Sequence, residues 1–117
     1  MEFSVEFYET DAGKCPLHEF LNDLKSSDPD DFASILAGLN KLKNRSYHRP
    51  PLSKAVGENL FELRHVGKLN TRILYFFFKG QRIIAVHGIR TKATKILKQD
   101  RQVAADRMRD WLRRFKT

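Results

Sequence analysis

Residues 71–90, TRILYFFFKGQRIIAVHGIR, decide the fold of this chain. They contain two apolar runs rich in β-branched and aromatic residues, which are separated by a short glycine-containing stretch, residues 79–81. Such runs favour β-strands, and so short a connection favours a hairpin. The segment therefore predicts two adjacent antiparallel strands.

Two more strands are predicted earlier in the chain. Residues 60–65, LFELRH, alternate apolar and polar side chains and reach the hairpin through the turn VGKLN. Residues 2–8, EFSVEFY, also alternate, and this strand is expected at an edge of the sheet. Residues 44–59 contain two prolines and a glycine without any period, which predicts a loop.

Three amphipathic helices are predicted. The first begins at Pro16, and the second begins at Pro29 with Asp28 as its N-cap. These two helices are expected to form an antiparallel pair that shares one apolar seam. The third begins near Asp100 and carries arginines on its polar faces. The apolar stripes consist of Leu17, Phe20, Leu21 and Leu24; Phe32, Ile35, Leu36, Leu39 and Leu42; and Ala104, Met108, Trp111, Leu112 and Phe115.

The order β-α-α-β-β-β-α predicts a single α+β domain over residues 1–117, in which the helices pack on a mostly antiparallel four-stranded sheet. The longest apolar run, residues 73–78, is far too short to cross a bilayer. The N-terminal segment carries acids where a signal peptide would carry bases, so a cytoplasmic location is expected. The single cysteine, Cys15, forms neither an internal disulfide nor a zinc site by itself.

Charge is distributed unevenly along the chain. Residues 1–40 have a net charge of −7 and residues 41–117 a net charge of +15, which gives +8 overall. Clustered Lys and Arg side chains displace counterions from phosphates, so this asymmetry suits a protein that binds a polyanion with one surface. A solvated basic surface without a ligand is the alternative.

Three arginines lie near strand ends, at Arg64, Arg72 and Arg90. Alternation places Arg64 on the same face as Glu62, away from the apolar residues of that strand. Neighbouring strands are expected to bring the three guanidinium groups together on one concave face, where they would bind phosphate. The alternative is three solvated or ion-paired arginines.

Other side chains with useful chemistry lie nearby. Lys54 belongs to the predicted loop, and Lys92 and Lys95 follow the last strand. Tyr75 has a ring that can stack on a base, but its apolar neighbours favour a core position. His87 is predicted to share a face with apolar residues and is equally suited to the core. Those residues are Ile83, Ala85 and Ile89.

Together these segments resemble the RelE superfamily of toxins, and most closely its phage-derived HigB-type branch. The resemblance covers nearly the whole chain in order. It is carried by CPLHEFLNDL (15–24), ENLFELR (58–64), RILYFFFKGQRIIAVHGIRTKATK (72–95) and a basic final helix. The resemblance implies the toxin of a type II toxin–antitoxin pair, a ribosome-dependent endoribonuclease that cuts messenger RNA. It implies no metal and no cofactor, because the RNA 2′-hydroxyl attacks the adjacent phosphate.

The resemblance also implies roles for individual residues. Arg64 and Arg72 match the positions that hold the scissile phosphate, and Arg90 matches a basic residue that stabilises the leaving oxygen. Lys54 matches loop lysines, and crowding by other cations would let it serve as the general base. Lys92 and Lys95 are expected to bind RNA or ribosomal backbone.

One position departs from the family pattern. Several relatives carry a base-stacking tyrosine near the position of Ile96, which is apolar in this chain. His87 is the ring expected to replace that tyrosine at the catalytic site, and Tyr75 is the aromatic candidate for RNA binding.

Two other functions remain open at this point. ParE relatives inhibit DNA gyrase by binding alone, and a basic RNA-binding module would have no toxicity. The clustered cations favour the nuclease. The partners implied by the resemblance are messenger RNA, the ribosome and a helix-turn-helix antitoxin of the HigA type, which would dock on the basic face or on the acidic N-terminal helices. No membrane partner is expected.

Overall fold

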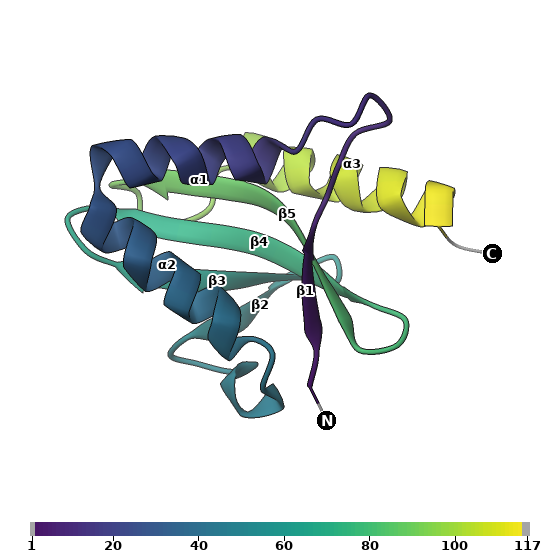
Figure 1. Ribbon diagram of the computed structural model, residues 1–117, viewed down its shortest axis with the longest axis horizontal. Helices are drawn as coiled ribbons and strands as arrows, with labels where there is room; N and C mark the ends of the chain where they lie inside the picture. Colours follow the sequence, from purple (N-terminus) through teal and green to yellow (C-terminus); the bar gives the residue numbers. More distant parts are fainter. Residues whose placement is uncertain (1, 116–117) are drawn as a thin grey trace.

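Five strands form one mixed sheet in the order β1-β5-β4-β3-β2, as the computed structural model of residues 2–115 shows (Figure 1). Strands β2 to β5 form an antiparallel meander, and β1 adds in parallel beside β5 at the edge. The strands are β1 (Ser4–Phe7), β2 (Ser53–Gly57), β3 (Leu60–Val66), β4 (Asn70–Phe78) and β5 (Arg82–Thr91). The helices are α1 (Pro16–Ser27), α2 (Pro29–Lys41), α3 (Lys98–Phe115) and the short 3₁₀ helix η1 (Arg45–Tyr47).

The predicted α+β class, the meander and the edge position of the first strand are confirmed, but the predicted strand count of four is wrong. The fifth strand, β2, lies within residues 44–59, which were predicted to form a loop. It pairs with β3 through a tight turn in which Glu58 and Asn59 both have positive φ angles. Asparagine often adopts this conformation but glutamate rarely does, so the turn has a weak sequence signal.

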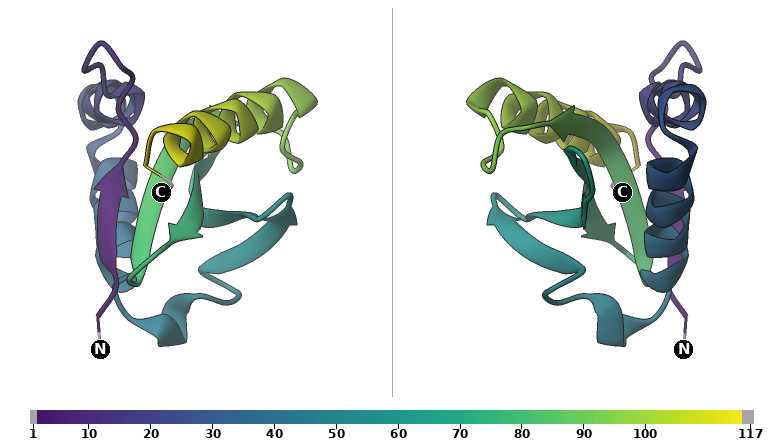
Figure 2. Two further views of the ribbon diagram at one scale, coloured as in Figure 1. Left: turned by 90° about the vertical axis from the view of Figure 1, so that its right-hand side faces the viewer. Right: turned by 90° about the vertical axis from the view of Figure 1, so that its left-hand side faces the viewer.

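The sheet separates two apolar cores. Figure 2 shows α1 and α2 on one face and α3 on the other. The core under α1 and α2 consists of Leu17, Leu21, Leu24, Ile35, Leu39, Leu42, Leu63, Ile73, Tyr75, Ile83 and Ala85. The core under α3 consists of Tyr8, Leu60, Leu74, Phe76, Ile84, Val86, Ile89, Ala104, Ala105, Met108 and Trp111.

The helix starts follow their local chemistry. Both predicted prolines occupy the first turns of α1 and α2, and the Asp28 carboxylate accepts a hydrogen bond from the backbone N–H of Asp31 at 3.1 Å. The predicted N-cap is therefore confirmed. Leu36 and Phe115 depart from the predicted stripes, because they are 42% and 45% exposed.

A β-bulge in β5 changes which side chains face each core. Tyr75 of β4 pairs with Ala85, whereas Leu74 pairs with His87, so Val86 is an extra residue in β5. An extra residue reverses the alternation of every side chain that follows it. Ala85 therefore faces α1 and α2, while His87 faces α3, and the prediction that these two side chains share a face is wrong.

The bulge also explains a close contact at Gly88. This residue pairs with Ile73 and so lies beneath α1, where the Phe20 ring covers it. A Cβ atom at Gly88 would stand only 2.4 Å from Phe20 Cδ2. Glycine is thus required at this position for packing, because no larger residue fits beneath the ring.

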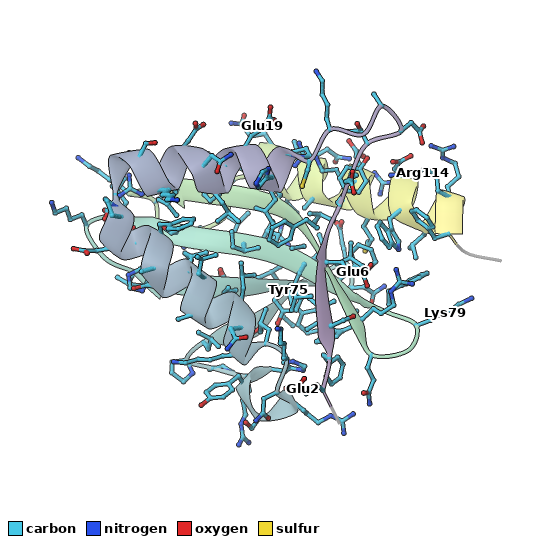
Figure 3. The ribbon with its side chains drawn as sticks, in the orientation of Figure 1. Glu2, Glu6, Glu19, Tyr75, Lys79 and Arg114 are labelled. Atoms are coloured by element: carbon cyan, nitrogen blue, oxygen red, sulfur yellow. The ribbon has the colours of Figure 1, made fainter. Side chains whose placement is uncertain are left out.

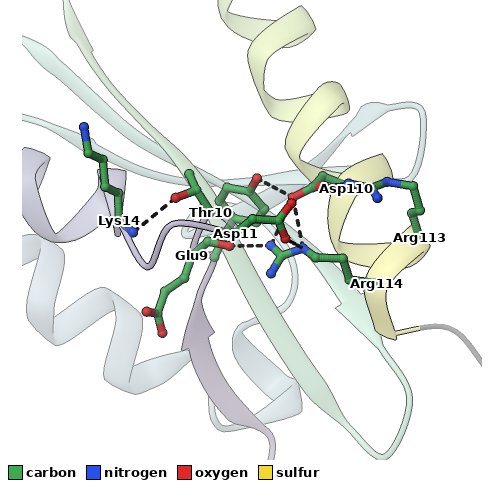
Figure 4. Close-up of polar contacts among 8 residues, drawn as sticks. Glu9, Thr10, Asp11, Lys14, Asp110, Arg113 and Arg114 are labelled. Atoms are coloured by element: carbon green, nitrogen blue, oxygen red, sulfur yellow. Dashed lines mark hydrogen bonds and ion pairs between the residues drawn. The ribbon is translucent and has the colours of Figure 1, made fainter.

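Polar contacts tie the segment after β1 to the end of α3 (Figure 4). The buried Tyr8 hydroxyl donates a 2.6 Å hydrogen bond to Asp110. Arg114 contacts the same carboxylate, the Asp11 carboxylate at 3.3 Å and the backbone carbonyl of Glu9. These contacts join the two ends of the described chain.

Replacing Tyr8 with phenylalanine is expected to destabilise the fold in a pH-dependent way. The Tyr8 hydrogen bond holds the pKa of Asp110 below its usual range. A carboxyl with a lowered pKa stabilises the fold above its unfolded value of about 3.9. This contribution disappears as the pH falls through the lowered folded value. Denaturant midpoints should therefore be lower for Tyr8→Phe than for the wild type at neutral pH, and the gap should close in acid.

The control is Tyr47→Phe, because the Tyr47 hydroxyl makes no hydrogen bond to the described residues. It should match the wild type throughout. A gap for Tyr8→Phe that is constant across the pH range would contradict the assignment of this contact to the ionised Asp110.

Candidate nucleic-acid interface

Two adjoining hollows lie beside β2 and β3 on the α3 side of the sheet. One has a volume of about 270 Å³ and the other about 360 Å³, and Lys54 and Glu62 line both. We call the two hollows together the cationic cleft. Its charged side chains are Lys54, Glu62, Arg64, Arg72, Lys95 and Arg101. With five cations and one carboxylate, the cleft has the charge that attracts a phosphate backbone.

Strand pairing places these side chains together. Lys54 of β2 is opposite Glu62 of β3, and Arg64 of β3 is opposite Arg72 of β4. Opposite residues in neighbouring strands point to the same face. The predicted shared face of Glu62 and Arg64 is thus confirmed. Arg101 reaches the cleft from the first turn of α3, where it donates a hydrogen bond to the backbone carbonyl of Val56.

Glu62 is the centre of the cleft's ion pairs. Its carboxylate is buried, with Oε2 3.0 Å from Arg72 Nε and Oε1 3.7 Å from Lys54 Nζ. The Nε–H of Arg72 is not aligned for a hydrogen bond, so this contact is an ion pair. Lys54 has a 56% exposed side chain and remains accessible from solvent.

Arg72 lies inside the protein. It is only 1% exposed, and it donates to the backbone carbonyls of Ala93 at 3.4 Å and Thr94 at 2.7 Å. It therefore holds the loop between β5 and α3 against the sheet. Sequence reasoning predicted a phosphate contact for Arg72, but a phosphate would reach this guanidinium only if the loop moved away.

Arg90 lies on the opposite face of the sheet. Its guanidinium pairs with Asp28 at 2.7 Å and with Asp31 at 3.5 Å, both at the start of α2. The expected convergence of three arginines is therefore wrong. The physical reason is the bulge at Val86, because it turns Arg90 away from the side chains of Arg64 and Arg72.

His87 faces α3 but does not line the cleft. Its Nε2 lies 2.9 Å from the Asp100 carboxylate, and its Nδ1 lies 3.3 Å from Arg107 Nη1. Arg107 also donates to the backbone carbonyl of Val86 at 2.7 Å, and burial lowers the pKa of its guanidinium. In this arrangement His87 joins β5 to α3.

Tyr75 is fully buried, and Figure 3 shows it inside the fold, whereas Lys79 projects outward. Its hydroxyl forms a hydrogen bond with that of Ser53, and burial raises its pKa. A base cannot stack on this ring, so the suggested contact of Tyr75 with RNA is not possible in this structure. Of the two predicted RNA-binding lysines, Lys95 lines the cleft and Lys92 is exposed outside it.

Sequence reasoning gave no role to Glu62 or Arg101. The sequence does indicate a position for Glu62, because alternation places this carboxylate on the same face as Arg64 within a basic part of the chain. The sequence gives no such indication for Arg101, because the position of its side chain depends on how α3 crosses the sheet.

Residues 2–115 provide neither a metal-ligand cluster nor a membrane-spanning helix. Their His, Cys, Asp and Glu side chains form no group of three that could hold a metal ion. No helix within this range is long and apolar enough to cross a membrane.

Comparison with known families gives one match. The model of the family described as Phage derived protein Gp49-like (DUF891) matches residues 22–109, about three quarters of the chain. The matched range includes every residue that defines the cationic cleft. No curated protein matches the chain.

Proposed function

This chain belongs to the Gp49-like family of phage-derived proteins, and from that premise we propose that it is the toxin of a type II toxin–antitoxin pair. In this proposal it is a RelE-superfamily toxin of the HigB-type branch that cuts messenger RNA on the ribosome. A neighbouring helix-turn-helix antitoxin neutralises it. The observation that carries the proposal is the cationic cleft, which five cations and one buried carboxylate line.

The proposed reaction needs cations that stabilise negative charge as it develops. The RNA 2′-hydroxyl loses its proton as its oxygen attacks the adjacent phosphorus. The bond to the 5′-oxygen breaks and that oxygen takes up a proton, so the products are a cyclic phosphate and a free 5′-hydroxyl. Negative charge grows on the phosphorus oxygens during this step. Fixed cations aimed at those oxygens stabilise the transition state more than the substrate.

Arg64 is the best-placed group for this work. It lines both the cleft and the adjoining surface, and it makes no ion pair with the described residues. Its Nε is buried without a hydrogen-bond partner. Arg64 as a whole is only partly buried, so the accessible part of its guanidinium can contact a phosphate in the cleft.

Lys54 supplies the second accessible cation. Sequence reasoning suggested that neighbouring cations would make it a base, but its ammonium lies beside the Glu62 carboxylate. The proposal therefore assigns Lys54 to binding and charge stabilisation.

Removing Arg64 or Lys54 is expected to abolish most cleavage. Arg64→Gln and Lys54→Gln should each lower the cleavage rate about 100-fold, as does the loss of one transition-state donor in other enzymes. The matched control is Lys79→Gln, since Lys79 is an exposed cation in the turn between β4 and β5. Cleavage is measured by mapping messenger ends in arrested cells, and folding by denaturant unfolding. Unchanged cleavage in both cleft variants would refute the proposal.

A second function is favoured by the ion pairs of Arg72 and Arg90. Because carboxylates hold both guanidinium groups, the chain has fewer free cations than a three-arginine nuclease site requires. A ParE-like toxin that inhibits DNA gyrase by binding needs no such site. Growth arrest with intact messengers and altered plasmid supercoiling would establish this function in place of cleavage, and absence of arrest would favour a basic RNA-binding module.

A further inference from the structure

A third hollow continues the cationic cleft beyond Arg64. It has a volume of about 500 Å³ and extends from the end of β3 to η1. We call it the η1 groove. It shares five lining residues with the neighbouring part of the cleft, namely Pro50, Pro51, Leu52, Arg64 and Val66. The cleft and the groove therefore form one continuous depression that extends along the surface from Arg101 to Tyr47.

Positive charges predominate along this depression. The η1 groove is lined by the cations Lys41, Arg49 and Arg64, and no acidic residue lines it. Neither Lys41 nor Arg49 forms an ion pair within residues 2–115. The carboxylate of Glu62, in the cleft, is buried between two cations. A continuous cationic path of this kind is complementary to an extended polyanion.

The η1 groove also presents an aromatic ring. Tyr47 is 40% exposed, and the ammonium of Lys41 lies 5.6 Å from the centre of its ring. The apolar residues that line the groove with it are Pro50, Pro51, Leu52 and Val66. Exposed aromatic rings beside cations are the usual stacking platforms for unpaired bases.

The short helix that carries Tyr47 is firmly anchored. The Asn44 side chain accepts a 2.9 Å hydrogen bond from the backbone N–H of Ser46. On the other side, the His48 ring lies 2.6 Å from the Leu42 carbonyl and packs against Phe3 and Phe77. The position of Tyr47 is thus fixed before any ligand binds, which reduces the entropy that binding costs.

We propose that single-stranded RNA lies along the η1 groove as it enters the cationic cleft. Tyr47 stacks on one base, and Arg49 and Lys41 contact the flanking phosphates. This inference rests on the proposed function and adds the path that the RNA strand takes along the surface. The RNA must be unpaired here, because the face of a paired base is covered by its neighbours in the helix.

Binding of a non-cleavable RNA tests this path. The probe is a fluorescent, fully 2′-O-methylated oligonucleotide of about 10 nucleotides, a length within the range that single-stranded binding folds cover. The methyl groups block the attacking oxygen, so affinity is measured without cleavage. The full-length chain is titrated against the probe, and fluorescence anisotropy reports binding.

Tyr47→Leu is expected to weaken binding roughly 5- to 100-fold, which corresponds to the loss of one base stack. Tyr47→Phe keeps the ring and should bind like the wild type. The matched control is Phe115→Leu, which removes another exposed aromatic ring from the end of α3. It should leave binding unchanged. Arg49→Gln should weaken binding and reduce the slope of log affinity against log salt by about one.

The outcomes separate this inference from the proposed function. Equal affinities for the wild type and Tyr47→Leu would overturn the path, and so would failure of the wild type to bind the probe. Messenger cleavage that still depends on Arg64 and Lys54 would leave the proposed function intact in either case. A Tyr47→Leu variant that loses affinity for the antitoxin but not for RNA would also overturn the path and would assign the groove to the antitoxin.

Discussion

Replacing Arg72 with methionine is expected to destabilise the protein by about 3–5 kcal/mol, the usual cost of breaking a buried ion pair from one side. The substitution leaves the Glu62 carboxylate buried with one cation, the exposed Lys54, at 3.7 Å. It also removes the two hydrogen bonds to Ala93 and Thr94 that hold the loop before α3. Denaturant unfolding measures the effect.

A double-mutant cycle gives the control for this prediction. The double variant Arg72→Met with Glu62→Leu removes both charges. Its loss in free energy of unfolding should be clearly smaller than the sum of the losses in the two single variants, because no unpaired charge then remains buried. Strict additivity would show that the two side chains do not stabilise each other. Loss of cleavage in the single Arg72 variant should be compared at equal amounts of folded protein, since the substitution affects folding first.

Replacing Arg90 with methionine is expected to cost about 3 kcal/mol of stability without lowering cleavage per folded molecule. The guanidinium pairs with Asp28 and with the buried Asp31 at the start of α2. Its removal leaves two neighbouring carboxylates without their arginine partner, and their mutual repulsion destabilises the fold. Because Arg90 lies on the face away from the cationic cleft, the proposed chemistry does not need it.

Arg109→Met is the matched control for Arg90→Met. Arg109 also pairs with an aspartate, Asp106, but both side chains are about 60% exposed. Surface pairs of this kind contribute little, so the control should change stability by less than about 1 kcal/mol. If Arg90→Met lowered cleavage while the amount of folded protein stayed the same, Arg90 would have a role in the reaction after all.

Local patterns in the sequence predicted much of the fold because the forces behind them are local. The Asp28 cap, the prolines at the helix starts and the apolar alternation of β3 all depend on residues a few positions apart. These features appear in the structure where the sequence places them. They are sufficient to bring Glu62 and Arg64 to one face.

The remaining errors come from interactions between distant residues. Strand β2 exists because it pairs with β3, and its five residues carry no alternation of their own. Arg72 is buried because a loop about twenty residues later folds back over it. Neither event leaves a periodic signal. The site was therefore predicted in the right region. However, Arg90 lies on the opposite face of the sheet, and Arg72 is buried beneath the loop instead of exposed in the cleft.

The extra residue in β5 has a consequence for how mutations in this strand should be interpreted. Side chains alternate between the two faces of the sheet both before and after Val86. The extra residue shifts this alternation by one position in the second half of the strand. Adding or deleting one residue at this point would exchange the α3 side and the α1/α2 side for half of the strand, so that Ile89 and Arg90 would each move to the side that the other now occupies. The length of this strand is thus constrained as tightly as its composition.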